Sequence, residues 1–157
     1  MLRAANRSDV PAILALIREL AAYEHLTDAC VATEELLAKN LFGEGRAAEA
    51  LVAEEEGLVV GYAIYFKTFS TFLARPGIYL EDIYVQPNHR GRGIGKGMLR
   101  EIARVAVDRG YGRVEWSVLD WNTPSIEFYK SLGAVPMEEW TMYRLSGDAL
   151  HKFGSLR

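Results

Sequence analysis

Sulfur and imidazole are scarce in this chain. Its 157 residues include 1 cysteine, Cys30, and 3 histidines. A lone thiol cannot form an intramolecular disulfide, the scattered histidines lack metal-ligand spacing, and Cys30 with His25 matches no nucleophile pattern. We therefore predict no metal and no catalytic cysteine, and the absence of a disulfide favours a reducing, cytoplasmic location.

Long apolar runs and an excess of positive charge are missing as well. No apolar stretch approaches the roughly 20 residues of a membrane-spanning helix, and none follows a basic head of the signal-peptide type. Lys+Arg 18 against Asp+Glu 21 gives a net charge of -3, so the chain has no general attraction to nucleic acid or to anionic lipid. We expect no nucleic-acid partner and no membrane partner.

The residues that are present suit one compact domain. Hydrophobic residues make up 50% of the chain and charged residues 25%. The sequence contains no internal repeat, low-complexity segment or interdomain linker. A single domain over residues 1–157 is the expectation.

Hydrophobic periodicity predicts the order of helices and strands. Helical spacing predicts helices near residues 10–21, 33–41, 98–106 and 122–132. Apolar and β-branched runs predict strands at residues 2–4, 50–53, 58–66, 78–85, 114–119 and 140–145. Turns are expected at Glu54–Gly57 and Arg75–Gly77. Helices interleaved with strands around a central hairpin predict an α/β fold with a mixed sheet.

A glycine-rich basic stretch follows the strand that ends at Val85. It contains Arg90, Gly91, Arg92, Gly93, Gly95, Lys96 and Gly97. Glycines that adopt positive φ before a helix let backbone N–H groups surround an anion, and the cations favour a phosphate ligand. The spacing fits neither the Walker loop nor the dinucleotide fingerprint. The alternative is a flexible glycine turn that caps the helix.

The pattern Arg-x-x-Gly-x-Gly, here Arg90, Gly93 and Gly95, resembles the acetyl-CoA loop of the GNAT superfamily of N-acetyltransferases. The likeness extends over nearly the whole chain, to diamine (spermidine/spermine) acetyltransferases and thialysine acetyltransferases. It rests on the segments Glu19–Glu24, Tyr79–Asp82, Trp121–Lys130 and Gly133–Ala134.

This resemblance implies a fold and a reaction. The fold would be a single-domain GNAT fold, with a mixed, mostly antiparallel central sheet flanked by helices. The reaction would move an acetyl group from acetyl-CoA directly to a primary amine of a small cationic acceptor, such as a polyamine, a diamine or a thialysine-like amino acid. The family also implies a homodimer. Acetyl-CoA would contact Ile83, Tyr84, Val85, Arg90, Gly91, Arg92, Gly93, Ile94, Gly95, Lys96, Asn122 and Ser125.

Two residues correspond to the family's proton-transfer groups. Tyr129 would be the general acid, since a phenol with a reference pKa of about 10 stays protonated at neutral pH yet can donate to a thiolate. The alternative is core packing on an apolar helix face. Glu81 would be a base that works through water, and the alternative is a surface or salt-bridge carboxylate. Strand alternation would point the neighbouring Asp82 to the opposite face.

The family's acceptor-binding positions combine carboxylates with aromatic rings, which suits an ammonium ligand. They are Tyr23, Glu24, Glu81, Glu139 and Trp140. The alternative for this set is a solvated helix face and a core tryptophan. Two other functions stay open: acetylation of a protein terminus or lysine side chain, and a CoA-binding sensor without turnover.

Overall fold

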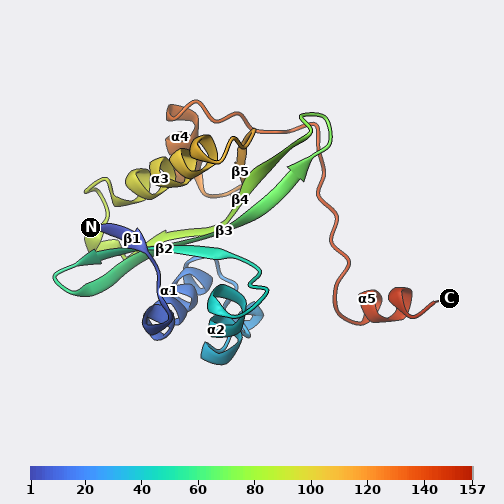
Figure 1. Ribbon diagram of the computed structural model, residues 1–157, viewed down its shortest axis with the longest axis horizontal. Coiled ribbons are helices and arrows are strands. Elements are labelled where there is room, and N and C mark those ends of the chain that lie inside the picture. The colour runs from blue at the N-terminus through green and yellow to red at the C-terminus, as the bar shows by residue number, and fades with distance from the viewer. Residues whose placement is uncertain (157) are drawn as a thin grey trace. The chain divides into compact units, whose positions relative to one another are not determined.

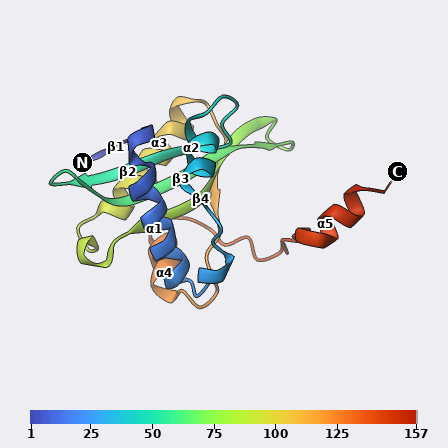
Figure 2. The same ribbon diagram turned by 90° about the horizontal axis from the view of Figure 1, so that it is seen from below.

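A computed structural model describes residues Met1 to Leu156. The chain divides into two compact units, of which the first covers Met1–Leu119 and the second begins at Asp120. Figures 1 and 2 show the helices and strands in chain order from blue to red. The first unit contains the whole sheet and the glycine-rich stretch. None of the helices in residues 1–156 is long and apolar enough to span a membrane.

The sheet has five strands in the order β1-β2-β3-β4-β5. Their bounds are Leu2–Ala4 for β1, Glu49–Glu55 for β2, Leu58–Ser70 for β3, Arg75–Val85 for β4 and Val114–Trp116 for β5. The first four strands pair antiparallel, and β5 joins β4 in parallel. The predicted mixed, mostly antiparallel sheet is therefore confirmed.

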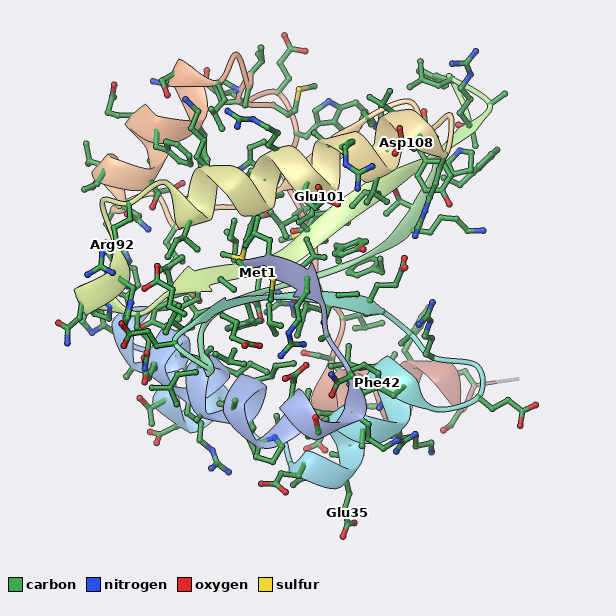
Figure 3. All side chains as sticks on the ribbon, turned by 60° about the vertical axis from the view of Figure 1, so that its left-hand side comes forward. Met1, Glu35, Phe42, Arg92, Glu101 and Asp108 are labelled. Atoms are coloured by element: carbon green, nitrogen blue, oxygen red, sulfur yellow. The ribbon has the colours of Figure 1, made fainter. Side chains whose placement is uncertain are left out.

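Helices cover both faces of this sheet. Helix α1 (Val10–Tyr23) and helix α2 (Glu34–Phe42) lie on one face, and helix α3 (Ile94–Asp108) lies on the other (Figure 3). Short 3-10 turns, η1 (Arg7–Asp9), η2 (Thr27–Ala29) and η3 (Pro87–His89), precede or follow these helices. The second unit contributes helix α4 (Thr123–Ser131) and helix α5 (Gly147–Gly154).

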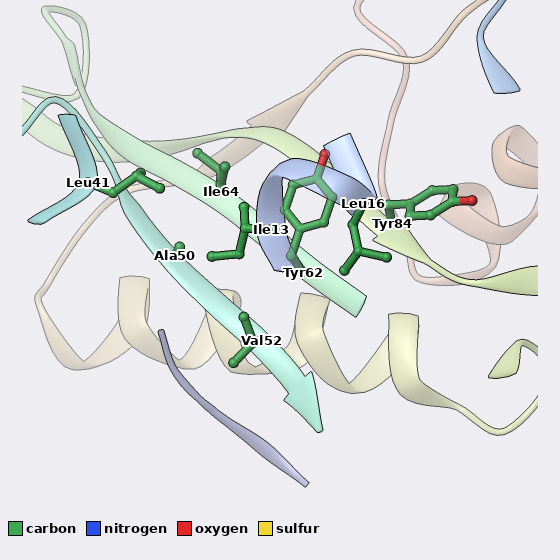
Figure 4. Packing of buried hydrophobic residues seen from close by; sticks show 8 residues of the cluster. All are labelled: Ile13, Leu16, Leu41, Ala50, Val52, Tyr62, Ile64 and Tyr84. Carbon is green, nitrogen blue, oxygen red and sulfur yellow. The ribbon is translucent and has the colours of Figure 1, made fainter. Parts of the chain in front are cut away.

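A hydrophobic core joins α1 to the sheet. Ile13 and Leu16 of α1 pack on Val52 of β2 and on Tyr62 of β3 (Figure 4). The Tyr62 side chain is 0% exposed, so burial of its ring stabilises the α1 face while its hydroxyl group needs a polar partner.

Two local predictions are wrong. The turn expected at Arg75–Gly77 lies instead at residues 71–74, because β3 and β4 pair as far as Ser70 and Arg75. Gly77 lies within β4, where its lack of a side chain lets the backbone of Arg113 come close: a Cβ on Gly77 would lie 2.9 Å from the Arg113 carbonyl oxygen. The strand expected at residues 140–145 is not formed, and α5 follows it without having been predicted. An apolar run forms a strand only where a neighbouring strand supplies hydrogen-bond partners.

Candidate active site

A β-bulge in β4 separates the two neighbouring carboxylates Glu81 and Asp82. Ile64 of β3 pairs with Asp82, and the next residue of β3 pairs with Leu80, so Glu81 has no partner in the register. Such a bulge breaks the alternation of side chains and re-aims them. Asp82 consequently shares the α1 face with Ile64, while Glu81 is exposed at the bulge.

An open pocket of about 210 Å³ lies at the end of α1, lined by α1, by the segment Leu26–Cys30 that follows it, and by Asp82 of β4. Apolar side chains of α1, including Ile17 and Leu20, form much of its wall. Its titratable groups are Glu24, Cys30 and Asp82. The pocket therefore joins a hydrophobic wall to two carboxyl groups, which suits an aliphatic chain that carries a positive charge.

The two carboxyl groups of the pocket bind protons more tightly than ordinary side chains do. Burial raises the pKa of Asp82 to about 6, and the negative charges of Glu81 and Glu24 act in the same direction. The Tyr62 hydroxyl donates a hydrogen bond to Asp82 Oδ2 over 3.0 Å and opposes the rise. Burial also raises the pKa of Glu24. A cation in this pocket would favour the ionised form of both groups.

Arg90 connects the end of α1 to the start of the glycine-rich stretch. Its Nε donates to the Val85 carbonyl over 2.7 Å. Its guanidinium carbon lies 5.4 Å from the ring centroid of Tyr23 and 5.2 Å from that of Tyr84, within the range of a cation–π interaction. Arg90 therefore fixes the wall that precedes Glu24, a role that the motif alone did not indicate.

A second connection to α1 was missed by sequence reasoning. Glu19 accepts hydrogen bonds from the Tyr84 hydroxyl over 3.1 Å and from Gln86 Nε2 over 3.0 Å. Glu19 stands in the motif that carried the family resemblance, but nothing local showed that it reaches Tyr84 of β4 and Gln86 just after this strand, which are 65 and 67 positions away.

The glycine-rich stretch has the backbone that an anion-binding loop requires. Gly91 and Gly93 adopt φ of +79° and +80°, and Gly93 caps the N-terminus of α3. No atom lies within 4 Å of the position where a Cβ would stand on either glycine. The first N–H groups of a helix lack intrahelical partners and carry its positive dipole end, so this loop offers an anion site at the start of α3.

Two residues attach this loop to the β2–β3 hairpin. His89 Nδ1 lies 2.6 Å from Glu55 Oε2, and Arg92 Nη1 donates to the same oxygen over 3.0 Å. The hydrogen bond from His89 and the charge of Arg92 lower the pKa of Glu55. Arg92 thus already has an anionic partner on the protein.

The unpaired edge of β4 lies close to this loop. Strand β5 pairs with β4 only at Ile78–Leu80. Within the described strands, the stretch Asp82–Val85 pairs with β3 alone. The outward backbone groups of Ile83 and the outward N–H of Val85 therefore offer hydrogen bonds of the kind that an amide-containing ligand takes up, while the Val85 carbonyl already accepts from Arg90.

The remaining predicted site residues lie in the second unit, some on α4 and some after it. Asn122 is 8% exposed and caps the helix, because its side-chain oxygen accepts from Ser125 N over 3.4 Å. Tyr129 lies on the same helix, partly buried, with its ring 5.7 Å from that of Phe128. Glu139 and Trp140 lie further on, outside any helix or strand. Trp140 is 75% exposed, so the alternative that it is a core tryptophan is wrong.

Comparison with known proteins decides the family. A family model described as "Acetyltransferase (GNAT) family" matches residues 16–134, from α1 through α4. The chain belongs to the GNAT family. Within residues 1–156, no group of three or more His, Cys, Asp or Glu could hold a metal ion.

Similar proteins point to a subfamily within the GNAT family. It is 42% identical to a thialysine N-epsilon-acetyltransferase of Bos taurus, with 97% of this chain and 95% of the relative covered. It is 34% identical to the human spermidine/spermine N(1)-acetyltransferase-like protein 1, where the match covers 95% of this chain but 23% of that longer protein. The subfamily suggested by the sequence motifs is therefore confirmed.

A solved structure supports the GNAT fold over the whole chain. An integron cassette protein from the mobile metagenome of V. cholerae superposes with a TM-score of 0.84 at 27% identity, covering 99% of this chain and 98% of the other. The predicted fold and the prediction of an N-acetyltransferase are confirmed at the level of the family.

Proposed function

We propose that this GNAT protein transfers the acetyl group of acetyl-CoA directly to a primary amine of a small cationic acceptor, namely a diamine, a polyamine or a thialysine-like amino acid. The observation that carries the proposal is the pocket at the end of α1, where Glu24 and Asp82 stand on an apolar wall. The relatives' names, which refer to thialysine and to spermidine/spermine, agree with such an acceptor. The chain would work as one catalytic domain in the cytoplasm.

The donor fits the loop at the start of α3. The pyrophosphate of acetyl-CoA would take the N–H groups around Gly91, Gly93, Ile94 and Gly95, with Lys96 supplying positive charge. Arg90 and Arg92 flank the loop, where Arg90 is held by Val85 and Arg92 by Glu55. The amides of the pantetheine arm would pair with the open edge of β4 at Ile83–Val85. In the second unit, the family resemblance assigns Asn122 and Ser125 to the same cosubstrate.

The chemistry needs three proton transfers. In this proposal the amine nitrogen forms a bond to the acetyl carbon, the carbon–sulfur bond breaks, and the thiolate takes a proton from Tyr129. The acylated nitrogen then gives up its extra proton, which restores the Tyr129 phenol and leaves a neutral amide. Glu81, exposed at the bulge of β4, removes the proton of the incoming ammonium through water. Tyr23, Glu24, Glu139 and Trp140 would hold the acceptor. Neither a covalent enzyme intermediate nor a metal takes part.

A panel of acceptors tests the proposed function. With acetyl-CoA as donor, kcat/KM for diamines, polyamines, thialysine and lysine should exceed kcat/KM for neutral amines and acidic amino acids, because the pocket carries carboxylates. It should also exceed kcat/KM for basic peptides, because a pocket of about 210 Å³ suits a small molecule. A faster reaction with neutral or acidic acceptors would rule out a cationic acceptor. A faster reaction with peptides would favour a protein acetyltransferase, and CoA binding without any turnover would favour a sensor.

Replacing Glu81 by glutamine tests the base. The rate should rise with pH toward the pKa of the amine, and Glu81→Gln should reduce turnover more at pH 7 than at pH 9.5, because a deprotonated amine needs no base. The measurement is the pH profile of kcat for one diamine. Glu56→Gln removes an exposed carboxyl group at the β2–β3 turn and serves as the matched control. An equal loss at both pH values contradicts the role of Glu81.

We also propose that two copies form a homodimer. The family resemblance motivates the proposal, and the exposed apolar side chains after α4 support it: Val135 is 76%, Met137 62% and Tyr143 92% exposed. Isolated soluble chains seldom leave such a group uncovered. Sedimentation equilibrium at micromolar concentration should give twice the chain mass of 17.6 kDa, and a single-chain mass would exclude the dimer.

A further inference from the structure

Tyr62 is a buried polar residue that the proposed reaction does not use. It lies in β3, is 0% exposed, and packs in the core beside Ile13 and Leu16 of α1 (Figure 4). Its hydroxyl nevertheless reaches Asp82 Oδ2 over 3.0 Å. In the register Tyr62 is opposite Tyr84 and Asp82 is opposite Ile64. Tyr62 and Asp82 are therefore diagonal neighbours across β3 and β4, a separation that a long aromatic side chain spans.

Asp82 stands at the boundary between this core and the pocket. Tyr62 contacts it from the core, and the pocket, with Ile17 and Leu20 on its wall, adjoins it on the α1 face. A carboxylate accepts hydrogen bonds at both oxygens. The tyrosine uses Oδ2, so a ligand in the pocket can use Oδ1.

We propose that Tyr62 is a positioning residue for acceptor recognition: it holds the Asp82 carboxylate at the pocket wall, and the pocket thereby binds the second, non-reacting ammonium of a dibasic amine. This inference rests on the proposed function and deepens it. What it adds is the residue pair, Tyr62 with Asp82, that would hold the second ammonium of the proposed acceptor. The bulge between Glu81 and Asp82 gives the two amines of such a molecule separate carboxylates.

The charges around Asp82 show why it needs this donor. Facing it are Tyr62 from β3, Glu24 from the end of α1, Glu81 on its own strand and Cys30 after η2. All four groups are acids, and burial together with the neighbouring carboxylates raises the pKa of Asp82 to about 6. The Tyr62 hydrogen bond favours the charged form. Its loss would raise the pKa of Asp82 further, leaving more of the group neutral and unable to bind an ammonium at pH 7.

The test is the pH dependence of acceptor binding in Tyr62→Phe. With the pKa of Asp82 at about 6 in the parent, a rise of one unit lowers the ionised fraction of Asp82 about twofold at pH 7 and about tenfold at pH 5. The KM of the variant for 1,4-diaminobutane should rise by these factors at the two pH values. At pH 9 its KM should return toward that of the parent, because Asp82 then ionises in both proteins. At saturating diamine, kcat should stay within about twofold of the parent. For butylamine, which has no second ammonium, KM should not change.

Two variants separate positioning from packing. Tyr65→Phe removes the phenol oxygen of another buried tyrosine of β3 and should leave KM unchanged at every pH. In the Asp82→Asn background, where the side chain cannot ionise, adding Tyr62→Phe should have no further effect on KM, because the two residues act as one unit. An equal rise of KM at pH 7 and pH 9, or a rise that persists in the Asp82→Asn background, would overturn the inference.

The single cysteine gives a measurement without turnover. Cys30 is the only cysteine in the chain and lines the same pocket. Protection of Cys30 from iodoacetamide by 1,4-diaminobutane, measured as a rate ratio with and without diamine, reports occupancy of the pocket. Tyr62→Phe should weaken this protection at pH 7 more than at pH 9. Such protection without acetylation of any amine would support the inference and refute the proposed function. If diamines are acetylated but protection is equal in the parent and in Tyr62→Phe at every pH, the proposed function is supported and the inference about Tyr62 is refuted.

Discussion

Valine at position 93 should raise the dissociation constant of acetyl-CoA on the order of 10²-fold. Gly93 has φ +80° at the N-terminus of α3, and a β-branched residue held in that conformation costs about 1–3 kcal/mol, where each 1.4 kcal/mol is about tenfold in affinity. Relief of the strain would turn the loop N–H groups away from the phosphate position, and the added side chain would occupy that space. Isothermal titration with acetyl-CoA measures the effect.

Gly110 supplies the matched control at the other end of the same helix. It has φ +71°, and no atom lies within 4 Å of its Cβ position. Gly110→Val therefore introduces a similar backbone strain away from the loop. It should lower the melting temperature about as much as Gly93→Val does, while its affinity for acetyl-CoA stays that of the parent. A folded Gly93→Val protein with parental affinity would contradict the cosubstrate site.

The sequence predicted the order of the elements up to α4 because those elements depend on local signals. Apolar residues of α1 and α3 recur at helical spacing, Thr33 caps α2 through a 3.2 Å hydrogen bond from Leu36 N, and the turn at Glu56 and Gly57 uses φ of +50° and +79°. These features need only neighbouring residues. Where a strand depends on a partner, as at residues 140–145, an apolar pattern alone was insufficient.

The candidate site, too, has parts that the sequence could predict and parts that it could not. The glycine loop was visible in the sequence because positive φ and helix capping are properties of adjacent residues. The bulge at Glu81 was not visible, since it arises from the register between β3 and β4. Strand alternation placed Glu81 and Asp82 on opposite faces but could not show which of them faces α1. The contact between Tyr62 and Asp82, 20 positions apart, depends on that register too.

Register also explains why Glu24 and Asp82 share a pocket. Helix α1 packs on β3 and β4 through a core whose members come from separate parts of the chain, Ile13, Val52 and Tyr84 among them. Only this packing brings the end of α1 to the bulge of β4. This packing raises the pKa of both Glu24 and Asp82, because burying a carboxylate without a cation destabilises its charged form. Binding of an ammonium would relieve this cost, so stability and acceptor binding are coupled in this pocket.

Phenylalanine in place of Tyr129 should lower kcat by roughly 10² or more, the usual scale for a lost general acid. The phenol oxygen is the only atom removed, and Asn122, which caps α4, is untouched. The melting temperature and the dissociation constant of acetyl-CoA should therefore stay those of the parent. Steady-state kinetics with a saturating diamine measures the loss. Tyr143→Phe is the matched control, since it removes a phenol oxygen in the same unit from a side chain that is 92% exposed.

The leaving group identifies what the phenol does. A thiol of lower pKa than that of CoA leaves without full protonation, so the gap between Tyr129→Phe and the parent should shrink when an acetyl thioester of an aromatic thiol replaces acetyl-CoA. A packing role predicts the same gap with both donors, because the acetyl group and the acceptor are unchanged. Turnover of Tyr129→Phe within about twofold of the parent at every pH would exclude this tyrosine as the acid. The thiolate would then have to take its proton from water or from the acceptor ammonium, and acetyl transfer would remain while its proton route changed.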